Sequence, residues 1–243
     1  MTVSRGTQLD NAQRGGWMQA VFLESKQRVK DFRIALSEAR FKRYLDHAGG
    51  NEMAAIMLYH WNCSLAQSLY FSLHMWEISL RNRLNAFLCW KYNADWPYDN
   101  TRAVRNLAAK NKGRLADAIE RQERQRNVKQ APTGAIVADL SVGFWVSLLG
   151  KSYDNPYSWR YNIARIFPND KSIDRASASK ACDLLLDVRN RVAHHEPIFH
   201  LKLEQVRKDL DLLLGGMNDA AHAYTGAVCT FWPIWKSGPQ KVF

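Results

Sequence analysis

Apolar side chains recur at intervals of three and four residues along most of the chain. The repeat is clearest over 64–90, where Leu69, Leu73, Trp76 and Leu80 share one face of a helix. Only 13 glycines and 7 prolines interrupt the chain, and long stretches without either residue favour helices. No segment alternates as a strand does. The pattern therefore predicts an all-α fold.

Glycine, proline and polar turn residues divide this pattern into segments. We expect a first helix from Trp17 to Asp46 that Gly49 and Gly50 terminate. Asn51 is typical of an N-cap for a second helix that ends near residue 61. The later helices are predicted at 64–90, 101–129, 135–149, a short segment ending at Phe167, 173–195, 200–214 and 217–230.

These segments predict one helical domain of about eight helices over residues 17–230. We expect the polar residues 1–16 to be a disordered N-terminus and residues 231–243 to be a C-terminal tail. The chain is long enough for a substantial core.

The chain is basic, with 34 Lys and Arg against 23 Asp and Glu and a formal net charge of +11. Such a balance favours RNA, DNA or an anionic membrane as a partner, although an inert basic surface explains it equally well. Residues 101–129 hold nine basic and three acidic side chains, for which a solvated helix face is the simplest explanation. The candidate RNA contacts are Arg114, Arg121, Arg124, Arg126 and Arg191.

The cysteines Cys63, Cys89, Cys182 and Cys229 form no CxxC pair and lie at no zinc-finger spacing from a histidine. This predicts neither a disulfide framework nor a zinc site, and free thiols suit a reducing cytosol. The polar first twenty residues do not resemble a signal peptide, and no apolar run reaches the roughly 18 residues that a bilayer span needs. We therefore expect a cytoplasmic protein with no metal and no other cofactor.

Several common site motifs are absent: GxxxxGK[ST], GxGxxG after a strand, GxSxG and HExxH. Their absence argues against the usual nucleotide, hydrolase and zinc-protease sites.

The candidate chemistry lies on the helix predicted over 173–195. At about 100° per residue, one side carries Leu184, Leu185, Val188 and Val192, and the nearly opposite side carries Asp183, Asp187, Asn190 and His194. His194 is therefore predicted to project with Asn190 from a polar surface. His195 points back toward the apolar side and is predicted to be packed, with a hydrogen-bond partner.

Arginine and histidine together suit RNA transesterification. Histidine titrates in the range that a neutral-pH acid or base needs, and the planar guanidinium matches phosphate oxygens; no metal is required. Arg189 lies about 140° around an ideal helix from His194. The two share one face of a straight helix only if the long Arg side chain wraps around it; otherwise they could converge at a helix distortion or across a symmetric dimer interface. The alternative is a solvated helix end whose cations interact favourably with the dipole, and spacing alone favours it.

A second site of interest is Glu77 with Arg81 and Asn82. Glu77 and Arg81 are four residues apart in the order that favours a helix-surface ion pair, which is the simplest explanation. The functional alternative is a buried acid that orients an active-site arginine. The tripeptide Arg-Asn-Arg occurs at 81–83 and again at 189–191, which is weak evidence for a repeat.

Longer motifs carry a family resemblance. The segment Arg189-Asn190-Arg191-Val192-Ala193-His194-His195-Glu196-Pro197-Ile198-Phe199 resembles the Abi-like proteins, the AbiD/AbiF group of abortive-infection proteins within the HEPN superfamily. The HEPN signature is an Arg, usually a polar residue, and a His after four to six intervening positions. The resemblance covers about residues 36–230 in family order, through Ser37-Glu38-Ala39-Arg40-Phe41 with Tyr44-Leu45, Leu58-Tyr59-His60-Trp61-Asn62, Glu77 with Arg81-Asn82, and Ala138-Asp139-Leu140-Ser141-Val142-Gly143-Phe144-Trp145.

The resemblance implies a HEPN-like helical bundle with an N-terminal helical extension, and RNA cleavage by paired sites, usually in a dimer. It also implies a role in phage defence or toxin–antitoxin control. Arg189 and His194 would be catalytic, Asn190 would support them, and Glu77 and Arg81 would contribute to a second site. One branch of HEPN toxins is silenced by modification of a Tyr two residues after the His; Glu196 stands there in this chain.

Two functions from different classes follow: a ribonuclease toxin or defence effector, and a non-catalytic RNA-binding module. Membrane binding ranks third, because no strongly amphipathic basic helix is apparent. The expected partners are RNA, which includes a possible inhibitory RNA or antitoxin, and a second copy of the chain. In such a homodimer two copies of the 173–195 helix would build one cleft, whereas a single-chain site would use Glu77 and Arg81 as its second half.

Overall fold

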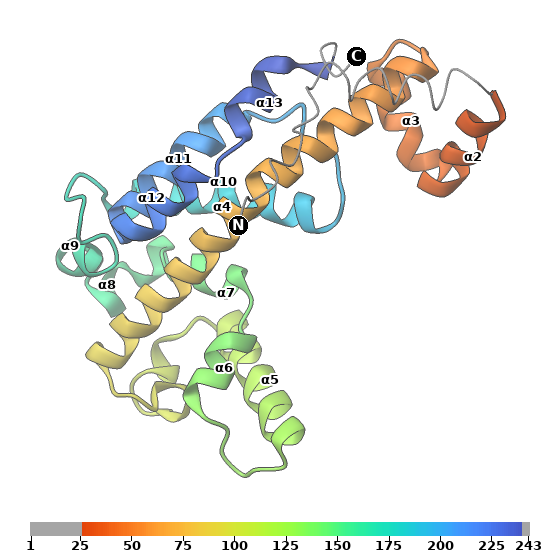
Figure 1. Ribbon diagram of the computed structural model, residues 1–243. Coiled ribbons are helices and arrows are strands. Elements are labelled where there is room, and N and C mark those ends of the chain that lie inside the picture. Colours follow the sequence, from red (N-terminus) through yellow and green to blue (C-terminus); the bar gives the residue numbers. More distant parts are fainter. Residues whose placement is uncertain (1–25, 240–243) are drawn as a thin grey trace, which may run out of the picture. The chain divides into compact units, whose positions relative to one another are not determined.

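The computed structural model describes residues 26–239, which Figure 1 shows as a ribbon. These residues form twelve α-helices and four 3₁₀ helices, and no strand occurs among them. The prediction of an all-α fold is therefore confirmed. The expected disordered segment 1–16, the start of the first helix at Trp17 and the last four residues of the expected tail lie outside the described residues.

The domain is built of two compact units. Of the described residues, the first unit holds 26–69, 196–201 and 229–239, and the second holds 70–195 and 202–228. Helix α4 (Glu52–Lys91) contributes to both as one helix of 40 residues. The expected break near residue 62 is wrong, because no glycine or proline interrupts this segment and its buried stripe continues through Leu65 and Leu69.

In the first unit, α2 (Lys26–Leu36) and α3 (Glu38–His47) replace the single helix expected up to Asp46. Ser37 separates them, with a φ of 69° that no α-helix accommodates. Gly49 and Gly50 both have positive φ and end α3 as predicted. Asn51 also acts as predicted, since its Oδ1 accepts the Ala54 N–H at 3.0 Å and caps α4.

The Leu-Tyr-His-Trp-Asn motif at 58–62 anchors two other segments of the first unit. The buried Asn62 accepts hydrogen bonds from the N–H groups of Ile198 and Phe199, at 2.7 and 3.2 Å. Trp61 donates from Nε1 to the Ile234 carbonyl at 2.9 Å. Ile234 belongs to α13 (Phe231–Ser237), so most of the segment expected to be a tail is an anchored helix.

The second unit contains the rest of the helices. Predicted segments are shorter or split here; for example, extended backbone at Leu140 and Ser141 divides the segment expected at 135–149. This splitting explains why the structure has more than the expected eight or so helices. The α-helices are α5 (Ala109–Arg126), α6 (Thr133–Asp139), α7 (Val142–Ser147), α8 (Asp154–Tyr157), α9 (Trp159–Asn162), α10 (Arg175–Ala193), α11 (Leu203–Met217) and α12 (Asp219–Ala227); the 3₁₀ helices are η1 (Trp96–Tyr98), η2 (Val104–Asn106), η3 (Lys151–Tyr153) and η4 (Ile163–Arg165).

The start of α10 is fixed from two directions. Asp174 caps the helix through a capping box with Ser177, whose N–H donates to the Asp174 carboxylate at 2.7 Å. Just before it, Asn169 donates from its backbone N–H to the Gly216 carbonyl and from Nδ2 to the Gly215 carbonyl, both at 3.1 Å. These contacts tie the N-terminal end of α10 to α11.

Buried apolar side chains of α4, α10 and α11 form the core of the second unit. Trp76, Leu80 and Leu84 of α4 are fully buried, as are Leu185 and Val188 of α10. α10 and α11 pack against each other, and so do α10 and α7. Among residues 26–239, no helix combines the length and apolar character that crossing a membrane requires.

Candidate active site

Arg189 on α10 and Glu77 on α4 form a two-pronged ion pair. The guanidinium donates from Nε to Oε2 at 3.0 Å and from Nη2 to Oε1 at 3.4 Å. The side chains are 37% and 26% exposed, so the pair is half-buried at the surface of the second unit. An arginine carries five N–H donors; two face Glu77, and the others stay free for a ligand.

Glu77 takes this position because its neighbours in α4 are core residues. Trp76 and Leu80 are fully buried, which fixes the rotation of α4 and directs Glu77 along the edge of the core toward α10. The expected ion pair between Glu77 and Arg81 is not what the structure shows: Arg81 instead donates weakly to Asn82 Oδ1 at 3.4 Å. The alternative prediction, an acid that orients an arginine, matches the geometry, with Arg189 as that arginine.

The predicted polar stripe on α10 is confirmed. Asp183, Asp187, Asn190 and His194 are all exposed, while Leu185 and Val188 are buried. His194 is the C-cap residue, and its N–H donates to the Asn190 carbonyl at 2.9 Å. Its imidazole therefore lies on the surface at the end of the helix.

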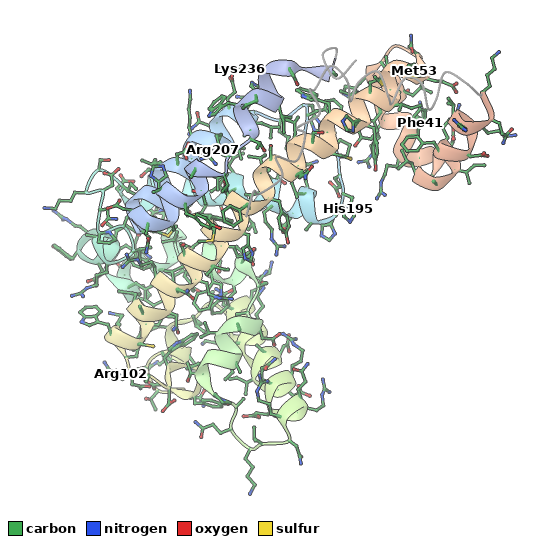
Figure 2. The ribbon with its side chains drawn as sticks, in the orientation of Figure 1. Phe41, Met53, Arg102, His195, Arg207 and Lys236 are labelled. Carbon is green, nitrogen blue, oxygen red and sulfur yellow. The ribbon has the colours of Figure 1, made fainter. Side chains whose placement is uncertain are left out.

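The prediction that His195 is packed is wrong. α10 ends at Ala193 rather than at residue 195, and His195 adopts a left-handed φ of 56°. This conformation turns the chain at the helix end, as a residue at this position often does, and leaves His195 exposed. Figure 2 shows its side chain at that end. Helical phase could not place His195, because the residue lies outside the helix.

Arg189 and His194 occupy the same end of α10 without contact between their side chains. Within residues 26–239, the guanidinium hydrogen bonds are those to Glu77, and the hydrogen bond of His194 is the one from its backbone. Within residues 26–239, neither side chain is therefore occupied by a hydrogen bond to the other.

Two arginines predicted to contact RNA also bind other parts of the fold, and their contact with RNA stays a prediction. Arg114 donates to the Gly143 carbonyl at 3.2 Å, and Arg121 pairs with Asp139 at 3.0 Å. Both partners lie in the Ala-Asp-Leu-Ser-Val-Gly-Phe-Trp motif at 138–145, so these arginines fasten α5 to α6 and α7. The prediction of RNA contacts failed to account for these partners, which only the tertiary structure shows.

The other three predicted RNA contacts stay at the surface. Arg124 is 72% exposed and Arg126 is also exposed, although Arg126 donates to Gln122. Arg191 pairs with Asp187 one turn back on α10, at 3.2 Å. Their contact with RNA stays a prediction.

The described residues contain no group of three or more His, Cys, Asp and Glu side chains placed to hold a metal ion.

Comparison with known proteins places the chain in a family. The model of the Abi-like protein family matches residues 25–200, which is more than half of the chain and includes Glu77, Arg189 and His194. The chain therefore belongs to the Abi-like protein family, and the resemblance drawn from its motifs is confirmed. No curated protein and no solved structure matches it.

Proposed function

We propose that this protein is a metal-independent endoribonuclease of the HEPN type that acts as a toxin or an abortive-infection effector. The observation that carries the proposal is the half-buried Arg189, held by Glu77 with free N–H donors, at the same helix end as the exposed His194. Membership of the Abi-like family supports the defence role.

The proposed reaction is attack of a ribose 2′-OH on the adjacent phosphorus. The O2′–P bond forms and the P–O5′ bond breaks, with a proton leaving the 2′-OH and a proton reaching the departing 5′-oxygen. Arg189 would bind the non-bridging oxygens, whose charge grows in the transition state. The products are a 2′,3′-cyclic phosphate and a 5′-hydroxyl.

The reaction needs one proton acceptor and one proton donor, and histidine suits either role near neutral pH. One chain offers one His194, at the same end of α10 as Arg189. A two-fold dimer in which two α10 ends meet would supply a second His194 and a second Arg189 to the same phosphate. The exposed polar stripe of α10 suits such a wet cleft.

We expect RNA cleavage to persist in EDTA and to leave 2′,3′-cyclic phosphate ends, because arginine and histidine can supply all the required charge and proton transfer. The measurement incubates purified protein with single-stranded RNA, with and without EDTA, and identifies the ends by mass spectrometry. A strict requirement for Mg²⁺ or Mn²⁺ would contradict the mechanism. RNA binding without any cleavage would favour the alternative, a non-catalytic RNA-binding module.

We expect a mixture of Arg189→Ala and His194→Ala chains to recover part of the cleavage activity that each variant alone lacks. In a shared cleft, some mixed dimers keep one intact Arg189 and one intact His194 on different chains. Mixing, with light scattering to measure mass, tests this. If light scattering shows that the active wild-type protein is a monomer, the shared cleft is ruled out and a single-chain site that uses Glu77 and Arg81 is favoured.

A further inference from the structure

A second charged site lies at the C-terminal end of α4. A hollow of about 420 Å³ opens there, and its polar lining consists of Lys91, Tyr92, Thr101, Arg102, Arg105 and Asn106. Figure 2 shows Arg102 beside this end of α4. Three lining side chains are cationic and none is acidic, so the hollow suits an anion.

Another hollow, of about 490 Å³, lies beside the end of α5 and has a different charge balance. Its lining includes Glu120 and Glu123 as well as Arg124 and Lys129. There the carboxylates offset the cations, so the positive character of the α4-end hollow does not simply reflect the basic composition of the chain.

The hollow is preorganised by its own polar contacts. Asn106 donates from Nδ2 to the Tyr92 hydroxyl at 2.9 Å, and Arg102 lies 5.8 Å from the centre of the Tyr92 ring. An acid of the same loop, Asp99, accepts from the Thr101 hydroxyl and from the N–H groups of Thr101 and Arg102. Those hydrogen bonds, the Thr101 hydroxyl first, lower the pKa of Asp99, so its carboxylate organises the loop as an anion.

The three cations have no acidic partner in the described part of the chain. No ion pair joins Lys91, Arg102 or Arg105 to a carboxylate among residues 26–239. Asp99 accepts the Arg102 backbone N–H and attracts the Arg102 guanidinium, but it forms no ion pair with that guanidinium. The hollow therefore presents positive charge that an external anion can neutralise.

Two flat side chains, those of Trp90 and Arg165, stack on each other outside the lining of the hollow. Trp90, which precedes Lys91, is 54% exposed, and the Arg165 guanidinium lies 3.5 Å from the centre of its ring. The buried Phe87 packs near Trp90 with ring centres 5.9 Å apart and holds it in place. Aromatic rings and arginine planes of this kind stack on unpaired nucleobases.

We propose that this α4-end site binds single-stranded RNA, with the phosphates at Lys91, Arg102 and Arg105 and an unpaired base against Trp90 and Arg165. Bases in a duplex are stacked on one another and could not use the flat surface. Lys91 lies 14 residues beyond Glu77 on α4, about 21 Å at the rise of an α-helix, so the site holds the strand away from the scissile phosphate. The proposal rests on the proposed ribonuclease function and names its substrate as single-stranded.

The test measures binding of poly(U) by fluorescence anisotropy, in the His194→Ala background so that the RNA stays intact. Lys91→Gln, Arg102→Gln and Arg105→Gln are combined in one variant. The control combines Lys171→Gln, Lys180→Gln and Lys208→Gln, exposed lysines elsewhere in the second unit, and removes the same charge. We expect the α4-end variant to raise Kd at least about tenfold and to lower the salt slope by roughly 2, for three lost phosphate contacts on a single strand.

The proposed site would be overturned if the α4-end variant and the control variant lost the same affinity for poly(U). It would also be overturned if the α4-end variant lost as much affinity for duplex RNA as for poly(U). With His194 restored, we expect the α4-end variant to cleave poly(U) more slowly but the dinucleotide UpA at the wild-type rate, because UpA is too short to reach the hollow. If the wild type cleaves neither RNA while the binding loss stays specific, the ribonuclease proposal fails and the binding site stands.

Discussion

Replacement of His194 by alanine is expected to lower the rate of RNA cleavage by about 10²–10⁴-fold, the usual contribution of general acid–base catalysis. The imidazole is exposed at the C-cap of α10, so its loss creates no cavity, and we expect the unfolding temperature to stay nearly unchanged. Cleavage of UpA and circular dichroism melting measure the two effects. An unchanged rate would remove His194 from the chemistry.

The neighbouring histidine provides the matched control. His195 is exposed and has a left-handed φ of 56°, a conformation that glycine adopts without steric cost. His195→Gly should therefore keep the fold, raise its stability by up to about 1 kcal/mol, and cleave RNA within about threefold of the wild-type rate. A folded but inactive His195→Gly beside an active His194→Ala would reverse the roles of the two histidines.

The second large effect is expected at Arg189. Arg189→Ala should lower cleavage by about 10²–10³-fold, as the loss of one donor to a transition-state oxygen does. Arg189→Lys should rescue little, because an ammonium group cannot bind Glu77 and a phosphate with a fixed planar geometry. Single-turnover rates at saturating RNA measure the loss.

Substitution of Glu77 tests whether this residue positions Arg189 for catalysis or only stabilises the fold. Glu77→Gln keeps an acceptor but removes the charge, so we expect a fall in kcat of about tenfold with little change in KM, since the guanidinium is less firmly oriented. Arg175→Ala is the control: Arg175 lies on α10, as Arg189 does, and the substitution removes an ion pair of 2.9 Å to Asp154 of α8, at 22% and 40% exposure. If both variants lose the same stability and the same activity, the Glu77–Arg189 pair serves only the fold.

Much of this site could be predicted from the sequence. Helical periodicity placed Asp187, Asn190 and His194 on an exposed face, because those residues lie within α10 and its C-cap. Asn51 and the Gly49-Gly50 pair also acted as predicted, since capping and left-handed backbone depend on local chemistry.

Contacts between distant residues could not be predicted in this way. Periodicity showed that Glu77 lies beside the core stripe of α4, but not that Arg189, 112 positions away, is its partner. For the same reason Arg114 and Arg121 looked like free surface cations. His195 was misplaced because one residue of left-handed backbone ends the periodicity on which its prediction depended.

The α4-end site was missed because its cations come from two separate segments. Part of the site is visible in the sequence, since the basic residue Lys91 stands between the aromatic residues Trp90 and Tyr92. The sequence could not show that the 3₁₀ turn at η2 would bring Arg102 and Arg105 to the same hollow.

The close approach of α11 to the start of α10 restricts which residues natural variants can carry at position 216. A Cβ added to Gly216 would lie 2.7 Å from Ile173 Cδ1 and 3.3 Å from Phe167 Cδ1. Even alanine would therefore push Ile173 aside, directly before the Asp174 cap, and a larger side chain would separate the two helices. We therefore expect relatives to keep glycine at this position because the close packing there sets the position of α10, although residue 216 takes no part in the chemistry.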